Sequence, residues 1–209
     1  MMTTRAAIYS SMAAPLTPMV KRHGNVVAHV DVKKVTRHGD GIVYGDVKKS
    51  QIDTPVGPLS LETSKDGLRA AYFDSWWEDQ SQPEQEGNGA ATADTIMREA
   101  KTQIQEYFAG IRKEFTVPLA SNGTSFQRKA WAALGRIPYG ETICYEEQAI
   151  SMGEPTKARA VGAANAKNPI CLFVPCHRVI AKGGGLCGYA GGVQIKQYLL
   201  NLEAGRLNG

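Results

Sequence analysis

The chain has 209 residues, of which 43% are hydrophobic and 21% are charged, values that are ordinary for globular proteins. This composition excludes a collagen-like repeat, a coiled coil and a wholly disordered chain, and four cysteines are too few for a disulfide scaffold. No apolar run approaches the roughly 18 residues that a membrane-spanning helix needs. The net charge is uneven: residues 1–50 and 126–209 each carry net +5, whereas residues 51–125 carry net −6. This distribution is compatible with a polyanionic partner, although short windows of any sequence fluctuate by several charges.

Residues 1–49 are expected to form a basic extension with a short internal repeat. Arg-His-Gly occurs at residues 22–24 and 37–39, and Asp-Val-Lys-Lys follows each copy, at residues 31–34 and 46–49. Two copies are too few for a solenoid, which favours a basic hairpin or a flexible arm. The extension has no convincing export signal, so we expect a reducing, cytoplasmic location, in which cysteines are more often free, catalytic or metal-bound than paired.

Residues 50–120 predict a small antiparallel sheet with one covering helix. The expected strands cover residues 51–55, 58–64 and 68–73. Asp66-Gly67 is a strong hairpin signal between the last two strands. Apolar residues that recur every four positions, followed by Gly110, predict a helix over residues 93–109: Ile96, Ala100, Ile104 and Phe108.

Residues 121–209 predict a mainly helical domain. Helices are expected over residues 126–134, 145–152, 156–167 and 193–203. The second and third are short and joined by a few residues that include a glycine, which is the outline of a helix-turn-helix. An apolar strand is expected at residues 170–174, after the Asn168-Pro169 stop. The predicted fold is therefore mixed α/β, of the α+β kind.

The densest group of reactive residues is Cys176-His177, directly after the expected strand. A thiolate is a strong nucleophile, and a free cysteine has a pKa of about 8.5. A nearby histidine can take the thiol proton while a carboxylate orients that histidine. The alternative is a buried cysteine beside an unrelated histidine, and a lone Cys-His pair by itself favours this alternative.

The remaining cysteines do not predict a metal site. Cys144, Cys171 and Cys187 lack CxxC spacing, so no structural zinc site is expected. The other histidines all lie within residues 23–38 and are expected to be solvated. Side chains alternate along a strand, so Cys171 is expected to face away from the pocket that holds Cys176.

Six motifs in order resemble the methylated-DNA–protein-cysteine methyltransferases, the O6-alkylguanine-DNA alkyltransferases, of the bacterial type. They are Tyr-Gly-Glu-Thr at 139–142 with Tyr145, Ala-Arg-Ala-Val-Gly at 158–162, Asn-Pro at 168–169, Pro-Cys-His-Arg-Val at 175–179, Gly-Tyr-Ala-Gly-Gly at 188–192, and Leu199-Leu200 with Glu203. The match is nearly gap-free over residues 126–203, and a weaker match at residues 54–59 and 66–68 extends it back to about residue 50.

The resemblance implies a reaction and a set of catalytic residues. Cys176 would attack the alkyl carbon on O6 of guanine, with some activity on O4-alkylthymine, and the stable thioether would limit each molecule to one transfer. His177 would take the thiol proton through a water, and Glu203 would hold His177. Asn168 would brace the turn before the active site, and Tyr145 would donate a proton near guanine N3.

The resemblance also implies how DNA is engaged. Duplex DNA hides the alkylated oxygen, so the nucleotide must be flipped out. Arg159 would fill the gap that it leaves, and Lys157 would add a phosphate contact. Small residues would let the same helix approach the minor groove: Ala158, Ala160 and Gly162. Tyr189 and Ala190 would line the alkyl pocket, and the backbone near Val174 would read the base edge.

The sequence thus predicts an enzyme for direct DNA repair that needs no cofactor or metal. Its expected partner is double-stranded DNA bound through the minor groove; it is expected to be monomeric, nucleoid-associated and without membrane contact. One alternative is a lesion-binding module without catalysis, which alkyl transfer to Cys176 would exclude. The other is a cysteine hydrolase, which turnover of a thioester or peptide without DNA would favour.

Overall fold

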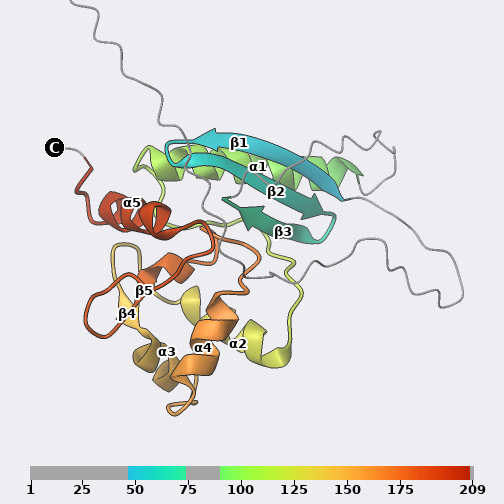
Figure 1. Cartoon of the computed structure of the whole chain (residues 1–209). Coiled ribbons are helices and arrows are strands. Elements are labelled where there is room, and N and C mark those ends of the chain that lie inside the picture. The colour runs from blue at the N-terminus through green and yellow to red at the C-terminus, as the bar shows by residue number, and fades with distance from the viewer. Residues whose placement is uncertain (1–46, 74–89, 208–209) are drawn as a thin grey trace, which may run out of the picture. The chain divides into compact units, whose positions relative to one another are not determined.

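The computed structural model describes residues 47–73 and 90–207, and most of the predicted basic extension lies outside these ranges. A three-stranded antiparallel sheet comes first, with its strands in sequence order: β1 (Lys48–Thr54), β2 (Gly57–Ser64) and β3 (Gly67–Tyr72) (Figure 1). The two lysines at 48 and 49, which the sequence assigned to the extension, are the first residues of β1. Lys48 lies 3.6 Å from Asp94 in an ion pair.

One face of this sheet is covered by α1 (Ala90–Phe108), as the sequence predicted (Figure 1). The helix begins three residues earlier than expected and ends one residue earlier. Its periodic apolar residues, such as Ala100 and Ile104, are buried with Leu59 and Leu68 of the sheet. The covering helix exists because an antiparallel sheet with one apolar face must bury that face against another element.

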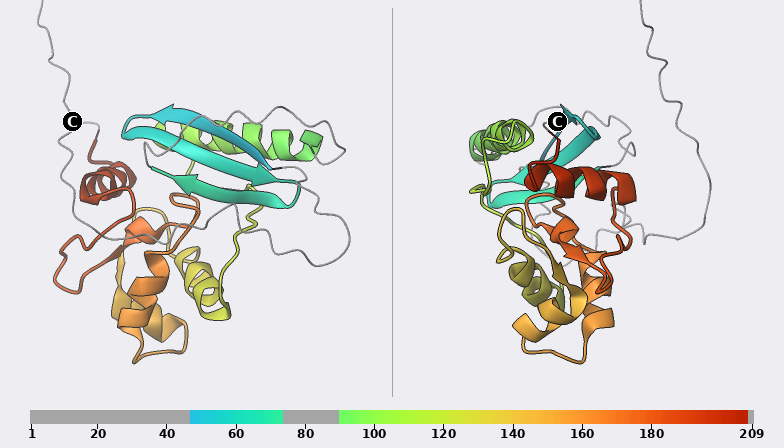
Figure 2. Two further views of the ribbon diagram at one scale, coloured as in Figure 1. Left: turned by 45° about the vertical axis from the view of Figure 1, so that its right-hand side comes forward. Right: turned by 90° about the vertical axis from the view of Figure 1, so that its left-hand side faces the viewer.

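The helices α2 (Ser125–Leu134), α3 (Tyr145–Ser151) and α4 (Ala158–Asn165) form a second group (Figure 2). They share a small core made largely of alanine side chains. Gln148 and Asn165 bind each other through both amide groups, at 3.1 and 2.7 Å, and Gln148 also donates to the Ala130 carbonyl at 3.1 Å. This polar pair links all three helices, and α3 and α4 are short helices joined by residues 152–157.

Helix boundaries agree with the local signals in the sequence. The helix α5 (Val193–Glu203) has the predicted bounds, and α2 begins one residue early, after a capping box between Thr124 and Gln127. The helix α4 is shorter than the predicted range of residues 156–167, because Lys157 has a non-helical backbone and the chain after Asn165 continues as a turn. Together these elements confirm a mixed α/β fold with a small antiparallel sheet.

The segment that leads to the active site is a turn, so the predicted strand at residues 170–174 is wrong. Only Ile170 makes a β-bridge, with Ala71 of β3. The chain then folds back: the Val174 amide donates to the Ile170 carbonyl at 3.0 Å, and Leu172 has a φ of 74°. The apolar run signals complete burial on both sides, and burial alone does not distinguish a strand from a compact turn.

A second pairing closes the chain around this turn. The 3-10 helix η1 (Cys176–Arg178) leads into β5 (Val179–Ile180), which pairs in parallel with β4 (Ile143–Cys144) at the start of α3. The turn is thus held by β3 on its N-terminal side and by β4 on its C-terminal side. None of the helices in the described ranges has the length and hydropathy that crossing a bilayer requires.

Candidate active site

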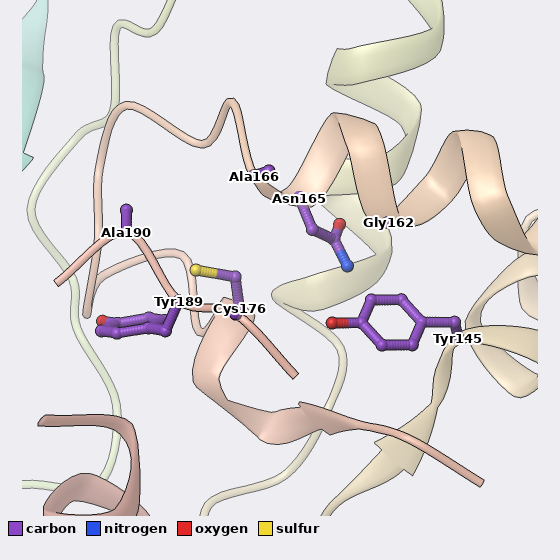
Figure 3. Close-up of a pocket in the computed structure, with 8 residues that line it drawn as sticks. Tyr145, Gly162, Asn165, Ala166, Cys176, Tyr189 and Ala190 are labelled. Atoms are coloured by element: carbon purple, nitrogen blue, oxygen red, sulfur yellow. The ribbon is translucent and has the colours of Figure 1, made fainter. Parts of the chain in front are cut away.

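A cavity of about 240 Å³ opens beside Cys176 (Figure 3). Its walls come from the start of α3, from the C-terminal half of α4 and the residue after it, from η1 and from the loop before α5. The lining residues are Tyr145, Gly162, Asn165, Ala166, Cys176, Gly188, Tyr189 and Ala190. The Tyr145 hydroxyl points across the cavity toward Cys176 (Figure 3). Four residues that the sequence proposed for catalysis or substrate contact therefore meet here.

Cys176 lies at the start of η1 with 8% of its surface exposed. Asn168 Nδ2 donates to its Sγ at 3.3 Å and to the Val174 carbonyl at 2.8 Å, while Asn168 Oδ1 accepts from the Ile170 amide at 3.1 Å. A hydrogen bond from Cys171 is the largest influence that lowers the pKa of Cys176, and it outweighs the opposing effect of burial. The thiolate form is therefore favoured at a nearly dry position.

His177 is completely buried, and its Nε2 lies 2.8 Å from Glu203 Oε1. Burial lowers the pKa of His177, although Glu203 acts in the opposite direction. A neutral imidazole that donates from Nε2 to the carboxylate keeps its lone pair on Nδ1. The Nδ1 atom is buried and has no hydrogen-bond partner among the described residues. This histidine can thus accept a proton at Nδ1.

Glu203 is the centre of a buried network that the sequence reveals only in part. Besides His177, its carboxylate accepts from Arg178 at 2.8 and 2.9 Å, from the Tyr107 hydroxyl at 2.7 Å and from the Gly140 amide at 3.0 Å. Burial alone would raise the pKa of Glu203, but the bonds from His177 and Arg178 lower it to about 2. The carboxylate is therefore a fixed anion behind the histidine.

The roles of Arg178 and Tyr107 were missed by sequence reasoning. Arg178 stands inside the Pro-Cys-His-Arg-Val motif, which signals its importance but not its partner. Tyr107 lies on α1, and nothing near it in the sequence points to a carboxylate 96 positions away. It ties the helix that covers the sheet directly to the active-site network.

Lys196 on α5 is a buried cation that the sequence did not single out. It is 1% exposed, and its Nζ donates to the carbonyls of Val179 at 2.6 Å and Cys187 at 3.3 Å. None of the ion pairs formed by the described residues includes it. Burial lowers the pKa of Lys196, and its charge in turn helps to lower the pKa of Cys176.

Cys171 does not line the cavity, as the sequence predicted, but the reason given is wrong, because its side chain lies against Cys176 and not on an opposite face. The two side chains form a hydrogen bond, which is the first cause of the raised pKa of Cys171, followed by burial. The prediction assumed strand alternation, and residues 170–174 form a turn in which that rule does not apply. The Tyr189 hydroxyl also lies beside Cys171, and its pKa is raised by burial first and then by electrostatic interactions with the two neighbouring cysteines.

Tyr145 keeps its proton under ordinary conditions. Burial is the main reason that its pKa is raised, and electrostatic interactions with the nearby Cys187 and Cys176 add to the effect. Its hydroxyl is therefore a hydrogen-bond donor that faces the cavity (Figure 3). Within the described residues, no group of three or more His, Cys, Asp or Glu side chains could hold a metal ion.

The remaining predicted DNA-contacting residues lie on or beside α4, outside the cavity lining. Arg159 and Ala160 are exposed, Ala158 is half-buried, and no hydrogen bond or ion pair of the described residues includes Arg159. Lys157 is exposed but lies 2.8 Å from Glu154, whose other oxygen is 3.5 Å from Lys129. The Lys157 charge is thus already partly neutralised within the protein.

Comparison with known proteins bears directly on this site. Two family models of 6-O-methylguanine DNA methyltransferase match in succession, the ribonuclease-like domain over residues 47–121 and the DNA binding domain over residues 125–205. The methylated-DNA–protein-cysteine methyltransferase of Methanosarcina acetivorans is 44% identical over 161 residues, and the constitutive one of Bacillus subtilis is 45% identical over 153 residues; each alignment covers 72% of this chain, and 94% and 92% of the relative. The crystal structure of Mycobacterium tuberculosis OGT in complex with DNA superposes with a TM-score of 0.63 at 42% identity, covering 75% of this chain and 92% of that one. The resemblance predicted from the motifs is therefore confirmed, and the chain belongs to the methylated-DNA–protein-cysteine methyltransferase family.

Proposed function

We propose that this protein repairs DNA by moving the alkyl group of O6-alkylguanine onto its own Cys176. The observation that carries the proposal is a cysteine with a lowered pKa at the wall of a cavity, backed by a buried His177–Glu203 pair. Relatives that bear the name of this activity cover most of the described chain. O4-alkylthymine is a second substrate in this proposal.

The proposed chemical step uses only side chains of this protein. His177 takes the Cys176 proton through a water molecule, and the thiolate attacks the alkyl carbon. A carbon–sulfur bond forms as the carbon–oxygen bond breaks, and the electron pair stays on guanine O6. Tyr145 stabilises the departing guanine anion by donating a proton near N3. A thioether has no route back to the thiolate here, so each molecule reacts once.

DNA engagement is proposed to centre on α3 and α4, used as a helix-turn-helix in the minor groove. Arg159 is exposed and has no partner among the described residues, which leaves it free to fill the space of a flipped nucleotide. Small side chains on α4 let the helix approach the minor groove closely: Ala158, Ala160 and Gly162. Tyr189 and Ala190 then line the alkyl pocket. The backbone near Val174 reads the base edge.

The division into an N-terminal extension, a sheet domain and a DNA-binding domain at residues 121–209 is part of the same proposal, with the first boundary moved from residue 50 to Lys48, where β1 begins. So are the monomeric state and the cytoplasmic, nucleoid-associated location. A protein that acts on each lesion by itself needs no second copy for the reaction.

The test is an intact-mass measurement after incubation with duplex DNA that contains one O6-methylguanine. We expect a gain of one methyl group per protein, located on the peptide that holds Cys176, and no further turnover. Cys176→Ala should bind the same DNA without any mass gain. Binding without methyl uptake by the unmodified protein would favour a lesion-binding module, and turnover beyond one equivalent would contradict the proposal.

A further inference from the structure

Cys171 stands beside the nucleophile although five residues separate them in sequence. In an extended strand that spacing would place the two residues roughly 16 Å apart. The turn brings them together through the Val174–Ile170 bond of 3.0 Å and the Phe173–Cys171 bond of 3.0 Å between amide and carbonyl groups. Asn168 lies against both sulfurs: its side-chain Nδ2 is 3.3 Å from Cys176 Sγ, and its backbone carbonyl oxygen is 4.0 Å from Cys171 Sγ.

The two thiols differ in access and reactivity. Cys176 lines the cavity and favours the thiolate, so a small electrophile that enters the cavity meets it first. Cys171 is 1% exposed, does not line the cavity, and stays protonated because its pKa is raised. In the alkyl transfer derived above, Cys171 lowers the pKa of Cys176 but makes and breaks no covalent bond. A reactive thiolate with a protonated thiol in contact behind it is the arrangement of a peroxidatic and a resolving cysteine.

We propose that Cys171 is a resolving cysteine, which forms a reversible disulfide with Cys176 after a hydroperoxide has oxidised Cys176, and so switches alkyl transfer off. The inference rests on the proposed function only in taking Cys176 as the nucleophile. Its chemistry requires no DNA.

Both steps balance with a hydroperoxide as the oxidant. The Cys176 thiolate attacks the distal peroxide oxygen, the O–O bond breaks, and Cys176 becomes a sulfenic acid as hydroxide or alkoxide leaves with the electron pair and gains a proton. The Cys171 sulfur then attacks the Cys176 sulfur, the S–O bond breaks, and water leaves with the Cys171 proton. Each thiol has lost one electron to the peroxide. A dithiol reductant reverses the disulfide, whereas further oxidation of Cys176 to a sulfinic acid would be irreversible.

The neighbours of the pair support this sequence of events. Lys196 supplies positive charge that favours the initial thiolate, and Tyr189 places its hydroxyl next to Cys171. The exposed Cys187 is the competing thiol, because its carbonyl lies 3.3 Å from Lys196 Nζ and the next residue, Gly188, lines the same cavity. Cys144 is half-buried in β4, outside the lining of the cavity, and serves as a control thiol.

The experiment treats the reduced full-length protein with hydrogen peroxide and then blocks the remaining thiols. Trypsin releases one peptide, residues 168–178, that contains both Cys171 and Cys176. We expect this peptide to lose the mass of two hydrogen atoms and to escape thiol blocking, and a dithiol reductant to restore both thiols. Alkyl transfer, measured separately on the reduced, the peroxide-treated and the re-reduced protein, should be lost with peroxide and recovered with the dithiol.

Three single variants identify the resolving thiol: Cys171→Ser, Cys187→Ser and Cys144→Ser. In Cys171→Ser we expect Cys176 to advance to sulfinic acid, with a loss of alkyl transfer that the dithiol does not reverse. The other two should behave as the unmodified protein does. A Cys176–Cys187 disulfide, or equal recovery of Cys171→Ser, would overturn the inference. Failure of the reduced protein to accept an alkyl group would instead contradict the proposed function. It would leave the disulfide proposal standing, because the peptide measurement does not depend on DNA.

Discussion

Replacing Glu203 by Gln removes the buried anion on which the active-site network depends. The carboxylate accepts five hydrogen bonds, two of them from Arg178, which is itself only 7% exposed. In the variant the Arg178 guanidinium stays buried without its counter-charge. Removing one partner of a buried ion pair costs about 3–5 kcal/mol.

The pKa of Glu203 provides a second route to the same magnitude. It falls from an ordinary 4.5 to about 2 in the folded protein, which corresponds to about 3 kcal/mol of stability. Because the folded pKa is depressed, this stability is present above the unfolded value and is lost as the pH falls from about 4.5 toward 2. The two magnitudes agree, so Glu203→Gln should lower the free energy of unfolding by about 3 kcal/mol near neutral pH.

Urea unfolding at several pH values measures this change. With a urea dependence of about 1–3 kcal/mol/M, the midpoint should fall by between about 1 and 3 M at pH 7, and the gap between variant and unmodified protein should narrow below pH 4.5. The exposed Glu141→Gln is the control and should stay close to the unmodified protein. A loss below about 1 kcal/mol, or a gap that does not depend on pH, would refute the reasoning from the network.

Three further predictions concern reactivity and DNA binding. Lys196→Met should raise the pH midpoint at which iodoacetamide modifies Cys176, because the ammonium group that favours the thiolate is gone. Lys196→Arg should restore the midpoint. An unchanged midpoint in Lys196→Met would assign Lys196 a purely structural role. Arg159→Ala should slow alkyl transfer from duplex DNA more than transfer from free O6-alkylguanine, since only the duplex needs a side chain to fill the gap; equal slowing on both substrates would contradict this expectation. Lys157→Ala should weaken binding to all DNA. It should lower the slope of log affinity against log salt concentration by at most about one, because Lys157 is already paired with Glu154. Deleting residues 1–46, which carry net +3 and end before β1, should reduce affinity for undamaged DNA at low salt while the rate with free base is unchanged; unchanged affinity at low salt would show that this segment does not contribute.

The sequence alone determined most of the secondary structure, because the relevant signals are local. The helix at residues 193–203 was predicted with its observed bounds, and the apolar spacing of residues 96–108 located α1 to within three residues. Periodicity, capping residues and the glycine and proline stops act within one or two turns of chain, so they need no tertiary context. The ordered motifs likewise identified the family and the Cys176, His177 and Glu203 set.

The tertiary structure decided what surrounds the nucleophile. An uninterrupted apolar run at residues 170–174 is equally compatible with a strand and a buried turn, and the pairing of Ile170 with β3 selected the turn. That choice placed Cys171 against Cys176. Tyr107 and Lys196 reach the site from two other helices, α1 and α5. Because both are buried, Tyr107 binds the Glu203 carboxylate and Lys196 helps to lower the pKa of Cys176. Such contacts depend on how separate elements pack, and the electrostatics depend on the water that this packing excludes, so neither could be predicted from local sequence.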